Sequence, residues 1–217
     1  MWFDVLLPTS QFIPPRSQYR AMTLPWQFSV DLCQVITRST RFLLLSFFVQ
    51  LLAIILGVLL IGRPSWVSNQ PSPGSSLSFF QIFLTNSRAV ISISLGGFLF
   101  SIPTITALAL TGINTGIGFS LAVQRANLLV ALAAFGPHGL FELPALWLAG
   151  AAGLKITFSI IQYLRGNSQD IITSRDIKDF VVLVSFSLLL IIFAGWIEIN
   201  FTSEFVNDQN ISFFAGR

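Results

Sequence analysis

Long apolar runs separated by short polar stretches dominate the chain. The clearest run covers residues 42–62, directly after Arg38 and Arg41, and Arg63 closes its far end. About 20 apolar residues in a helix are needed to cross the hydrocarbon core of a bilayer. This run therefore predicts a membrane-spanning helix. The next segment, residues 63–80, is rich in proline, serine and glycine and predicts a surface loop.

Two more spans are predicted, over residues 88–111 and 113–135. Pro103 lies inside the first of them, where its missing backbone donor predicts a kink. Arg125 lies at the middle of the second, and an arginine at the bilayer centre costs about 2.5–3.5 kcal/mol on insertion scales. We expect residues 113–135 to cross with Arg125 facing the bundle interior. If they re-enter on the same side instead, the parity of the later spans changes.

Pro144 decides where the fourth span is expected to begin. Proline is favoured in the first turn of a helix and bends a helix from its interior. A helix over residues 144–164 is about 31 Å long at 1.5 Å per residue, close to one hydrocarbon core. The preceding Pro137–Gly139 then belongs to a bent or re-entrant segment. A polar loop over residues 165–179 and a fifth span over residues 180–199 follow.

The predicted fold class is all-α: a polytopic membrane helix bundle of about five transmembrane helices. Residues 1–41 form an N-terminal cytoplasmic lead-in, residues 42–200 the transmembrane domain and residues 201–217 a C-terminal tail. Within the lead-in, residues 26–40 interleave apolar and polar side chains. That pattern fits either an amphipathic helix lying on the membrane or an extended linker.

Small residues and prolines recur at positions expected to shape how the helices pack and bend. Ser92 and Gly96 are four apart, as are Gly112 and Gly116, and small residues at this spacing let helix backbones approach closely in lipid. The full set is Gly96, Pro103, Gly112, Gly116, Pro137, Gly139, Pro144, Gly150 and Gly153.

Composition agrees with a membrane protein. The chain is 53% hydrophobic and 10% charged, with a mean hydropathy of +0.77, whereas soluble domains carry about 25% charged residues. Its twelve basic residues are spread out, which argues against a nucleic-acid partner. A single cysteine, Cys33, excludes an internal disulfide, and a single histidine argues against a metal site. No nucleotide signature is present, so we expect no cofactor.

The distribution of Lys and Arg predicts the orientation. With five spans, Arg16, Arg20, Arg38, Arg41, Arg165, Arg175 and Lys178 fall on one side of the membrane. The other side keeps Arg63, Arg88 and Arg217. The positive-inside rule then places the N-terminus in the cytoplasm and the C-terminus outside, in the cell (inner) membrane.

Five ionisable residues lie in or against apolar segments, where such groups are costly: Arg125, His138, Glu142, Lys155 and Glu198. We expect Arg125, His138, Glu142 and Glu198 to form an intramembrane polar centre. Arg125 either forms a structural ion pair with Glu142 or Glu198, or contacts an anion. Glu198 is equally compatible with a solvated carboxylate at the end of its span. Lys155 is expected to extend toward the cytoplasm.

His138 and Glu142 are four residues apart and share a face if their segment is helical. Such a pair can relay protons, act as a general base or bind a metal, but zinc hydrolysis needs a third ligand that the chain does not offer. The preferred interpretation is structural. In it, Glu142 accepts hydrogen bonds from the exposed amides at the start of the next helix, and His138 fixes the bend. No residue is assigned a catalytic role.

One stretch carries a family resemblance. The run Pro137-His138-Gly139…Glu142-Leu143-Pro144-Ala145, followed by Ala149-Gly150 and Gly153-Leu154, resembles the stage II sporulation protein M (SpoIIM) family. Further matches, over about residues 80–202, are Asn86–Arg88, Gly96-Gly97, Asn114-Thr115-Gly116 and Ile197-Glu198 with Thr202. The family usually shows Asn-Gly where this chain has Asn114-Thr115-Gly116. Asn86 and Asn114 are the polar residues that this resemblance adds.

The resemblance implies a bacterial or archaeal multi-span membrane protein without established catalytic activity. The namesake is similar to a scaffold for peptidoglycan-degrading proteins, and other relatives accompany ABC transporters or circular bacteriocin systems. We therefore expect a non-enzymatic scaffold or membrane subunit, a homodimer in the lipid bilayer, with partners such as an ABC ATPase or a cell-wall hydrolase. The alternatives are a transporter or channel component, and an intramembrane hydrolase that uses His138 and Glu142.

Overall fold

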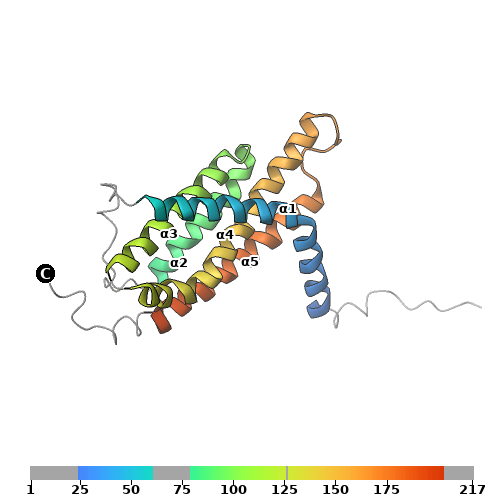
Figure 1. The fold of residues 1–217 in the computed structure, drawn as a ribbon. Helices are drawn as coiled ribbons and strands as arrows, with labels where there is room; N and C mark the ends of the chain where they lie inside the picture. The colour runs from blue at the N-terminus through green and yellow to red at the C-terminus, as the bar shows by residue number, and fades with distance from the viewer. Residues whose placement is uncertain (1–23, 61–78, 126, 203–217) are drawn as a thin grey trace, which may run out of the picture.

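The computed structural model describes residues 24–60, 79–125 and 127–202, and all its elements within these ranges are helical. They are α1 (Leu24–Leu59), α2 (Phe79–Leu95), the 3-10 turn η2 (Gly96–Leu99), α3 (Ile102–Arg125), α4 (Leu128–Leu164), α5 (Ser174–Ile197) and the π-helical turn η3 (Glu198–Thr202). Figure 1 shows them packed as a bundle.

Five segments of the described chain are long and apolar enough to cross a membrane, which confirms the predicted fold class. They are Leu32–Leu59, Phe79–Leu99, Ile102–Gln124, Phe135–Leu164 and Ser174–Asn200. The fourth is 61% buried over its most apolar window, against 22–39% for the other four. Helix α4 is therefore the centre of the bundle, and the other helices surround it.

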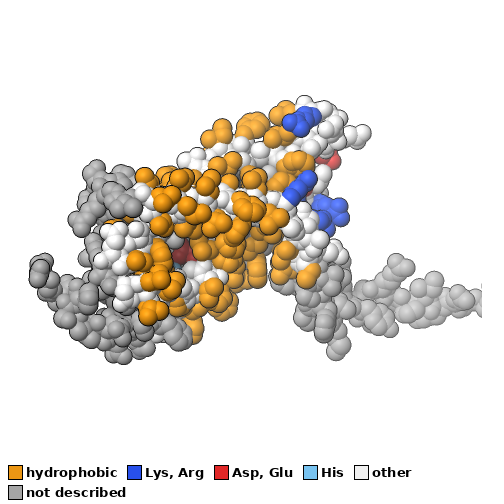
Figure 2. Space-filling model, viewed as in Figure 1, with side chains coloured by type: hydrophobic (Ala, Val, Ile, Leu, Met, Phe, Trp, Pro, Cys, Tyr) orange, Lys and Arg blue, Asp and Glu red, His pale blue; other side chains and the backbone are white. Residues whose placement is uncertain are grey.

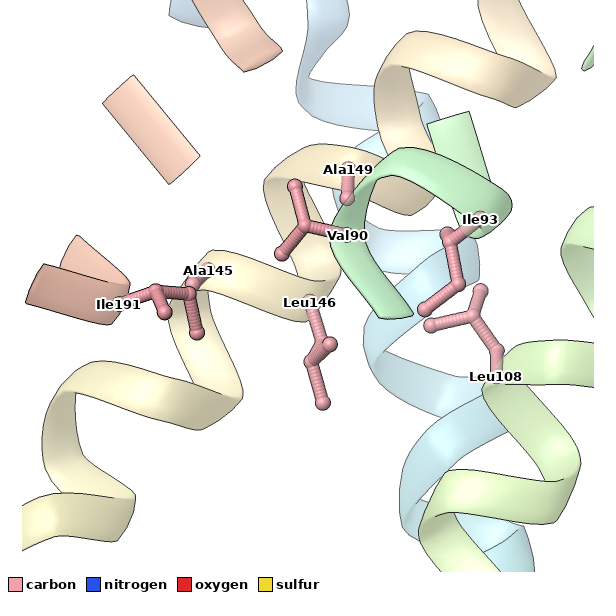
Figure 3. Packing of buried hydrophobic residues seen from close by; sticks show 7 residues of the cluster. All are labelled: Val90, Ile93, Leu108, Ala145, Leu146, Ala149 and Ile191. Atoms are coloured by element: carbon pink, nitrogen blue, oxygen red, sulfur yellow. The ribbon is translucent and has the colours of Figure 1, made fainter. Parts of the chain in front are cut away.

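The apolar core lies between helix α4 and the helices packed around it. Figure 3 shows Ala145, Leu146 and Ala149 of α4 among Val90 and Ile93 of α2, Leu108 of α3 and Ile191 of α5. Every residue from 148 to 157 is buried. In addition, α1 packs mainly along α3, and α5 mainly along α4. The small side chains of α4 allow this many helices to meet on one axis.

The predicted second and third spans have the wrong boundaries. The apolar stretch that we divided into residues 88–111 and 113–135 folds instead as a hairpin of α2–η2 and α3, with its turn at Phe100 and Ser101. Both turn residues have left-handed backbone angles, with φ of 55° and 58°. Neither residue is a glycine, so the sequence carries no conventional turn signal at this point.

Pro103 and Arg125 change position as a result. Pro103 is the second residue of α3 rather than a kink inside a span, and a missing N–H has no consequence in a first helical turn. Arg125 is the last residue of α3 rather than the middle of a span. The cost of an arginine at the bilayer centre therefore does not arise.

The predicted start of the fourth span at Pro144 is also wrong. Helix α4 begins at Leu128 and runs through both Pro137 and Pro144, so the segment around His138 is helical rather than re-entrant. Prolines in a helix interior each remove a backbone hydrogen bond. Figure 1 shows the first turns of α4, in olive, running in a different direction from the rest of the helix. The predicted bend is present, but inside the helix.

The other helices also begin earlier than expected. Helix α5 starts at Ser174 rather than residue 180, because Thr173 and Asp176 form a capping box. Helix α1 starts at Leu24, so the backbone of residues 26–40 is helical and continuous with the first span. The boundary expected at residue 41 thus falls inside α1. Residues 1–23 and most of the expected tail, from 203 on, lie outside the described residues.

The helices alternate in direction, so the bundle has two distinct ends. Contacts between Arg38 and Asp179, and between Ser101 and Thr157, place the start of the α1 apolar run, the α2–α3 turn and the α4–α5 loop together. We call this the basic end, because it holds Arg38, Arg41, Lys155, Arg165, Arg175 and Lys178. Figure 2 shows Lys and Arg side chains gathered at this end. The opposite end is called the distal end.

Candidate functional site

A buried ion cluster lies at the basic end. The Asp179 side chain is 0% exposed, and its Oδ1 accepts a hydrogen bond from Arg38 Nη2 at 2.7 Å. Its Oδ2 accepts a hydrogen bond from Lys155 Nζ. The exposed fractions of the Arg38 and Lys155 side chains are 30% and 11%. The cluster therefore joins α1, α4 and α5 at one point.

The start of α5 determines where Asp179 points. The capping box at Thr173 begins the helix early enough for Asp179 to fall on the same face as Leu183, Ser187 and Ile191, all of them buried. Ser187 Oγ donates to the carbonyl oxygen of Ala145 at 2.6 Å, which holds this face against α4. A carboxylate on that face needs cationic partners, since a buried charge without one is strongly destabilising.

Sequence analysis missed this cluster. Lys155 was identified and expected to extend toward the cytoplasm, but its bond to Asp179 was not predicted. Asp179 was expected in a loop, which is wrong, because it lies in α5. The signal that was available is the Thr-x-x-Asp pattern at Thr173 and Asp176, which marks a helix start. Had it been used, Asp179 would have been an ionisable residue on a helix face that is otherwise apolar.

A cavity of about 360 Å³ lies beside the cluster. Its wall is formed by Arg38, Arg41, Phe42, Lys155, Phe158, Ser159, Gln162, Asn167, Ser168, Asp170 and Asp176. The Arg41 guanidinium lies over the rings of Phe42 and Phe158, at 4.7 and 4.3 Å from their centroids. Arg38 Nε is buried and has no hydrogen-bond partner within the described segments. The cavity thus offers positioned cationic donors.

The distal end holds part of the polar centre that the sequence predicted. Glu142 of α4 and Glu198 of η3 lie close enough for their charges to interact, and α4 packs against η3. His138 is one turn before Glu142 on α4, and its ring centroid is 6.0 Å from that of Phe135. Glu198 is half-buried rather than fully solvated. Figure 2 shows an acidic group recessed among hydrophobic side chains.

Glu142 and Arg125 each have an expected role in this centre. The role of Glu142 as acceptor for the first amides of a helix is wrong, because α4 is continuous around it and no helix begins at Pro144. The ion pair of Arg125 with Glu142 or Glu198 stays a prediction. The backbone of Arg125 ends α3, whereas its side chain lies outside the described part of the structure.

The glycines expected to shape packing lie at two helix crossings. Where α1 crosses α3, a Cβ added at Gly116 would lie 2.2 Å from the carbonyl oxygen of Ile54, and one at Gly112 would lie 2.7 Å from the Ala53 Cβ. Where η2 meets α4, a Cβ at Gly97 would lie 2.1 Å from the carbonyl oxygen of Gly153. Backbones touch at both crossings, which in lipid is a main source of helix association.

The remaining predicted residues take various positions. A Cβ at Gly96 would meet Thr104, and one at Gly150 would meet Ser46 and Leu108, so both glycines are enclosed. By contrast, no described atom lies within 4 Å of a Cβ added at Gly139. Asn86 is half-buried on α2, and Asn114 is exposed on α3.

The fold and these two centres define a class: a polytopic membrane protein whose helices surround one central helix, with polar groups at its two ends. The sequence model of the Stage II sporulation protein M (SpoIIM) family matches residues 42–203. The chain belongs to this family. It is 35% identical over 129 residues to Uncharacterized protein MJ0793 of Methanocaldococcus jannaschii, covering 58% of this chain and 71% of the relative. No solved structure matches.

Proposed function

We propose that this chain is a non-enzymatic subunit of the cell membrane that holds partner proteins in a complex. The observation that supports the proposal is the closed centre of the bundle. Residues 148–157 of α4 are all buried, and Gly97 contacts Gly153 backbone to backbone. A polar path through one copy from the distal carboxylates to the basic end would have to cross this packed layer.

The partner surface that we propose is the first half of α4. Gly136 and Gly139 lie about one turn apart, and a Cβ added at either would meet no described atom within 4 Å. Leu140 beside them is 73% exposed. Small residues flanked by large apolar ones suit close contact with another helix in lipid. We propose a second copy of the chain as the occupant, giving a homodimer that then binds envelope proteins such as an ABC ATPase or a cell-wall hydrolase.

Gly139→Leu tests this surface. Because a Cβ added at this position lies more than 4 Å from any described atom outside its own helix, the variant should fold yet fail to dimerise. The mass of the purified protein in detergent, measured by light scattering, should fall to that of one copy, while the unfolding temperature stays near that of the native protein. Ser92→Leu adds similar bulk on the exposed face of α2 and should leave the dimer intact. A dimeric Gly139→Leu variant would contradict the proposal.

A flux measurement separates the scaffold from the transporter. Vesicles containing the purified protein should show no pH-dependent ion or peptide flux, because residues 148–157 of α4 are all buried against the neighbouring helices. Flux that disappears in Glu142→Gln would overturn the scaffold in favour of transport. Such a result would make the distal carboxylates part of a path rather than structural groups.

A further inference from the structure

The cavity at the basic end lies where the apolar run of α1 and the end of α4 meet the polar α4–α5 loop. Arg41 lies on its wall, immediately before the apolar run of α1 that starts at Phe42. The opposite wall comes from the end of α4 and the polar α4–α5 loop, through Gln162 and Asn167. A recess bounded by the end of an apolar run and by a polar loop meets both the hydrocarbon and the headgroup region. Its volume of about 360 Å³ is in the range of small-ligand sites.

The cavity wall carries three cationic side chains, Arg38, Arg41 and Lys155, and two of them share one carboxylate. Arg38 and Lys155 share the single carboxylate of Asp179, so this group keeps one positive charge in excess. The Arg38 side chain is 30% exposed, so part of its charge reaches the cavity, whereas its Nε is buried and donates to no described atom.

Arg41 is positioned for the same ligand. Its guanidinium is stacked on Phe42 and Phe158, and no hydrogen bond from it is formed within the described chain. Stacking occupies the faces of the guanidinium and leaves the donor edge available, which is the geometry that recognises a phosphate. The two rings also restrict the side chain, which reduces the entropy lost on binding.

The carboxylates on the wall limit how much negative charge the cavity accepts. Asp176 Oδ2 accepts hydrogen bonds from the backbone N–H and the hydroxyl of Thr173, and the carboxylate lies in the first turn of α5. Asp170 is exposed on the loop. With these two acids present, the donors of Arg38 and Arg41 suit one phosphate group rather than a multiply phosphorylated headgroup.

We propose that this cavity binds the phosphodiester of a membrane lipid headgroup, between α1, α4 and the α4–α5 loop. Arg41 donates to the phosphate oxygens, and the partly exposed Arg38 side chain adds positive charge beside them. Phe42 and Phe158 support the Arg41 guanidinium. Basic recesses between transmembrane helices near the cytoplasmic surface are a general solution for holding lipid headgroups.

The test measures lipid binding by the full chain. Delipidated protein in detergent is titrated with phosphatidylglycerol, and binding is followed by native mass spectrometry and by the rise in unfolding temperature. Arg41→Gln should bind this lipid about tenfold or more weakly, because a charge-assisted, bidentate contact is lost. Arg41→Lys keeps the positive charge but loses the planar guanidinium that stacks on the two rings. It should therefore bind more tightly than Arg41→Gln but more weakly than the native protein.

Two controls make the result decisive. Arg165→Gln removes an exposed charge at the same end of α4 that is not on the cavity wall, so it should bind the lipid like the native protein. Glycerol 3-phosphate and inorganic phosphate have a phosphate group but no acyl chains, so they should bind far more weakly than the lipid. Equal binding by Arg41→Gln and the native protein would overturn the site. Equal binding of glycerol 3-phosphate and the lipid would overturn the lipid as its ligand.

Discussion

Asp179 shows how one residue holds three helices together. Its two carboxylate oxygens accept from Arg38 and Lys155, which are 141 and 24 residues away in the sequence. Local patterns find an ionisable residue in an apolar segment, as they did for Lys155 and Glu142. They do not find the partner when it lies on another helix. The sequence indicated that Glu142 and Glu198 belong to one polar centre, but no pattern fixes which side chains contact each other.

The cluster makes a prediction about stability. Asp179→Asn keeps the size of the side chain but leaves Lys155 and Arg38 without a counter-charge in a buried site. Removing one partner of a buried ion pair typically costs about 3–5 kcal/mol. Thermal or denaturant unfolding in detergent should therefore show a large loss of stability. Asp170→Asn, on the exposed loop, should change the free energy of unfolding by less than about 0.5 kcal/mol. If both variants unfold alike, Asp179 does not hold the bundle.

At the scale of helices, hydropathy identified the apolar segments but not the residues at which one span ends and the next begins. Residues 79–124 are predominantly apolar, and neither of the two turn residues, Phe100 and Ser101, is glycine, proline or asparagine. The turn is held by tertiary contacts instead. The hydroxyls of Ser101 and Thr157 share a hydrogen bond of 2.5 Å, and Thr157 Oγ1 donates to the carbonyl oxygen of Gly97 at 2.6 Å. A sequence pattern within the hairpin does not reveal bonds that depend on α4.

Helix contact at Gly97 can be tested by adding one methyl group. In Gly97→Ala, the new Cβ would lie 2.1 Å from the carbonyl oxygen of Gly153, so η2 and α4 must separate. Overpacking of this kind costs about 1–3 kcal/mol. Gly118→Ala makes the same change inside α3, where the added Cβ would lie 3.4 Å from Phe135 Cζ, an ordinary contact, and alanine is a better helix former than glycine. Unfolding measurements should show a loss for the first variant and none for the second.

At the scale of the whole molecule, the number of spans was predicted correctly although two of them were placed wrongly. The errors at residues 88–111 and 113–135 moved boundaries along one continuous apolar stretch and left the number of crossings unchanged. The end to which each loop belongs therefore did not change, but Arg88, expected on the distal side of its span, lies inside the span Phe79–Leu99. Arg38, Arg41, Arg165, Arg175 and Lys178 share one end of the bundle, as the charge pattern indicated. The number of spans and the distribution of Lys and Arg between the two ends are properties of the whole chain. An error in one span boundary therefore changes them little.

The same charge asymmetry predicts which end faces the cytoplasm. Cys33 is exposed, precedes Arg38 on α1 by about one turn and is the only cysteine. An impermeant thiol reagent should fail to label it in intact cells and should label it in inverted membrane vesicles. In a Cys33→Ser background, Asn167→Cys on the α4–α5 loop should behave like Cys33. Asn127→Cys, between α3 and α4 at the distal end, should label in intact cells.

The three positions together give more than an orientation. Opposite labelling of residues 127 and 167 requires that α4 crosses the membrane despite Pro137 and Pro144, and like labelling of residues 33 and 167 requires an even number of crossings between them. Labelling of Cys33 from outside would reverse the orientation and place the basic end in the outer leaflet. The cavity beside Arg41 would then face lipids of the outer leaflet, so this experiment also decides which leaflet supplies its ligand.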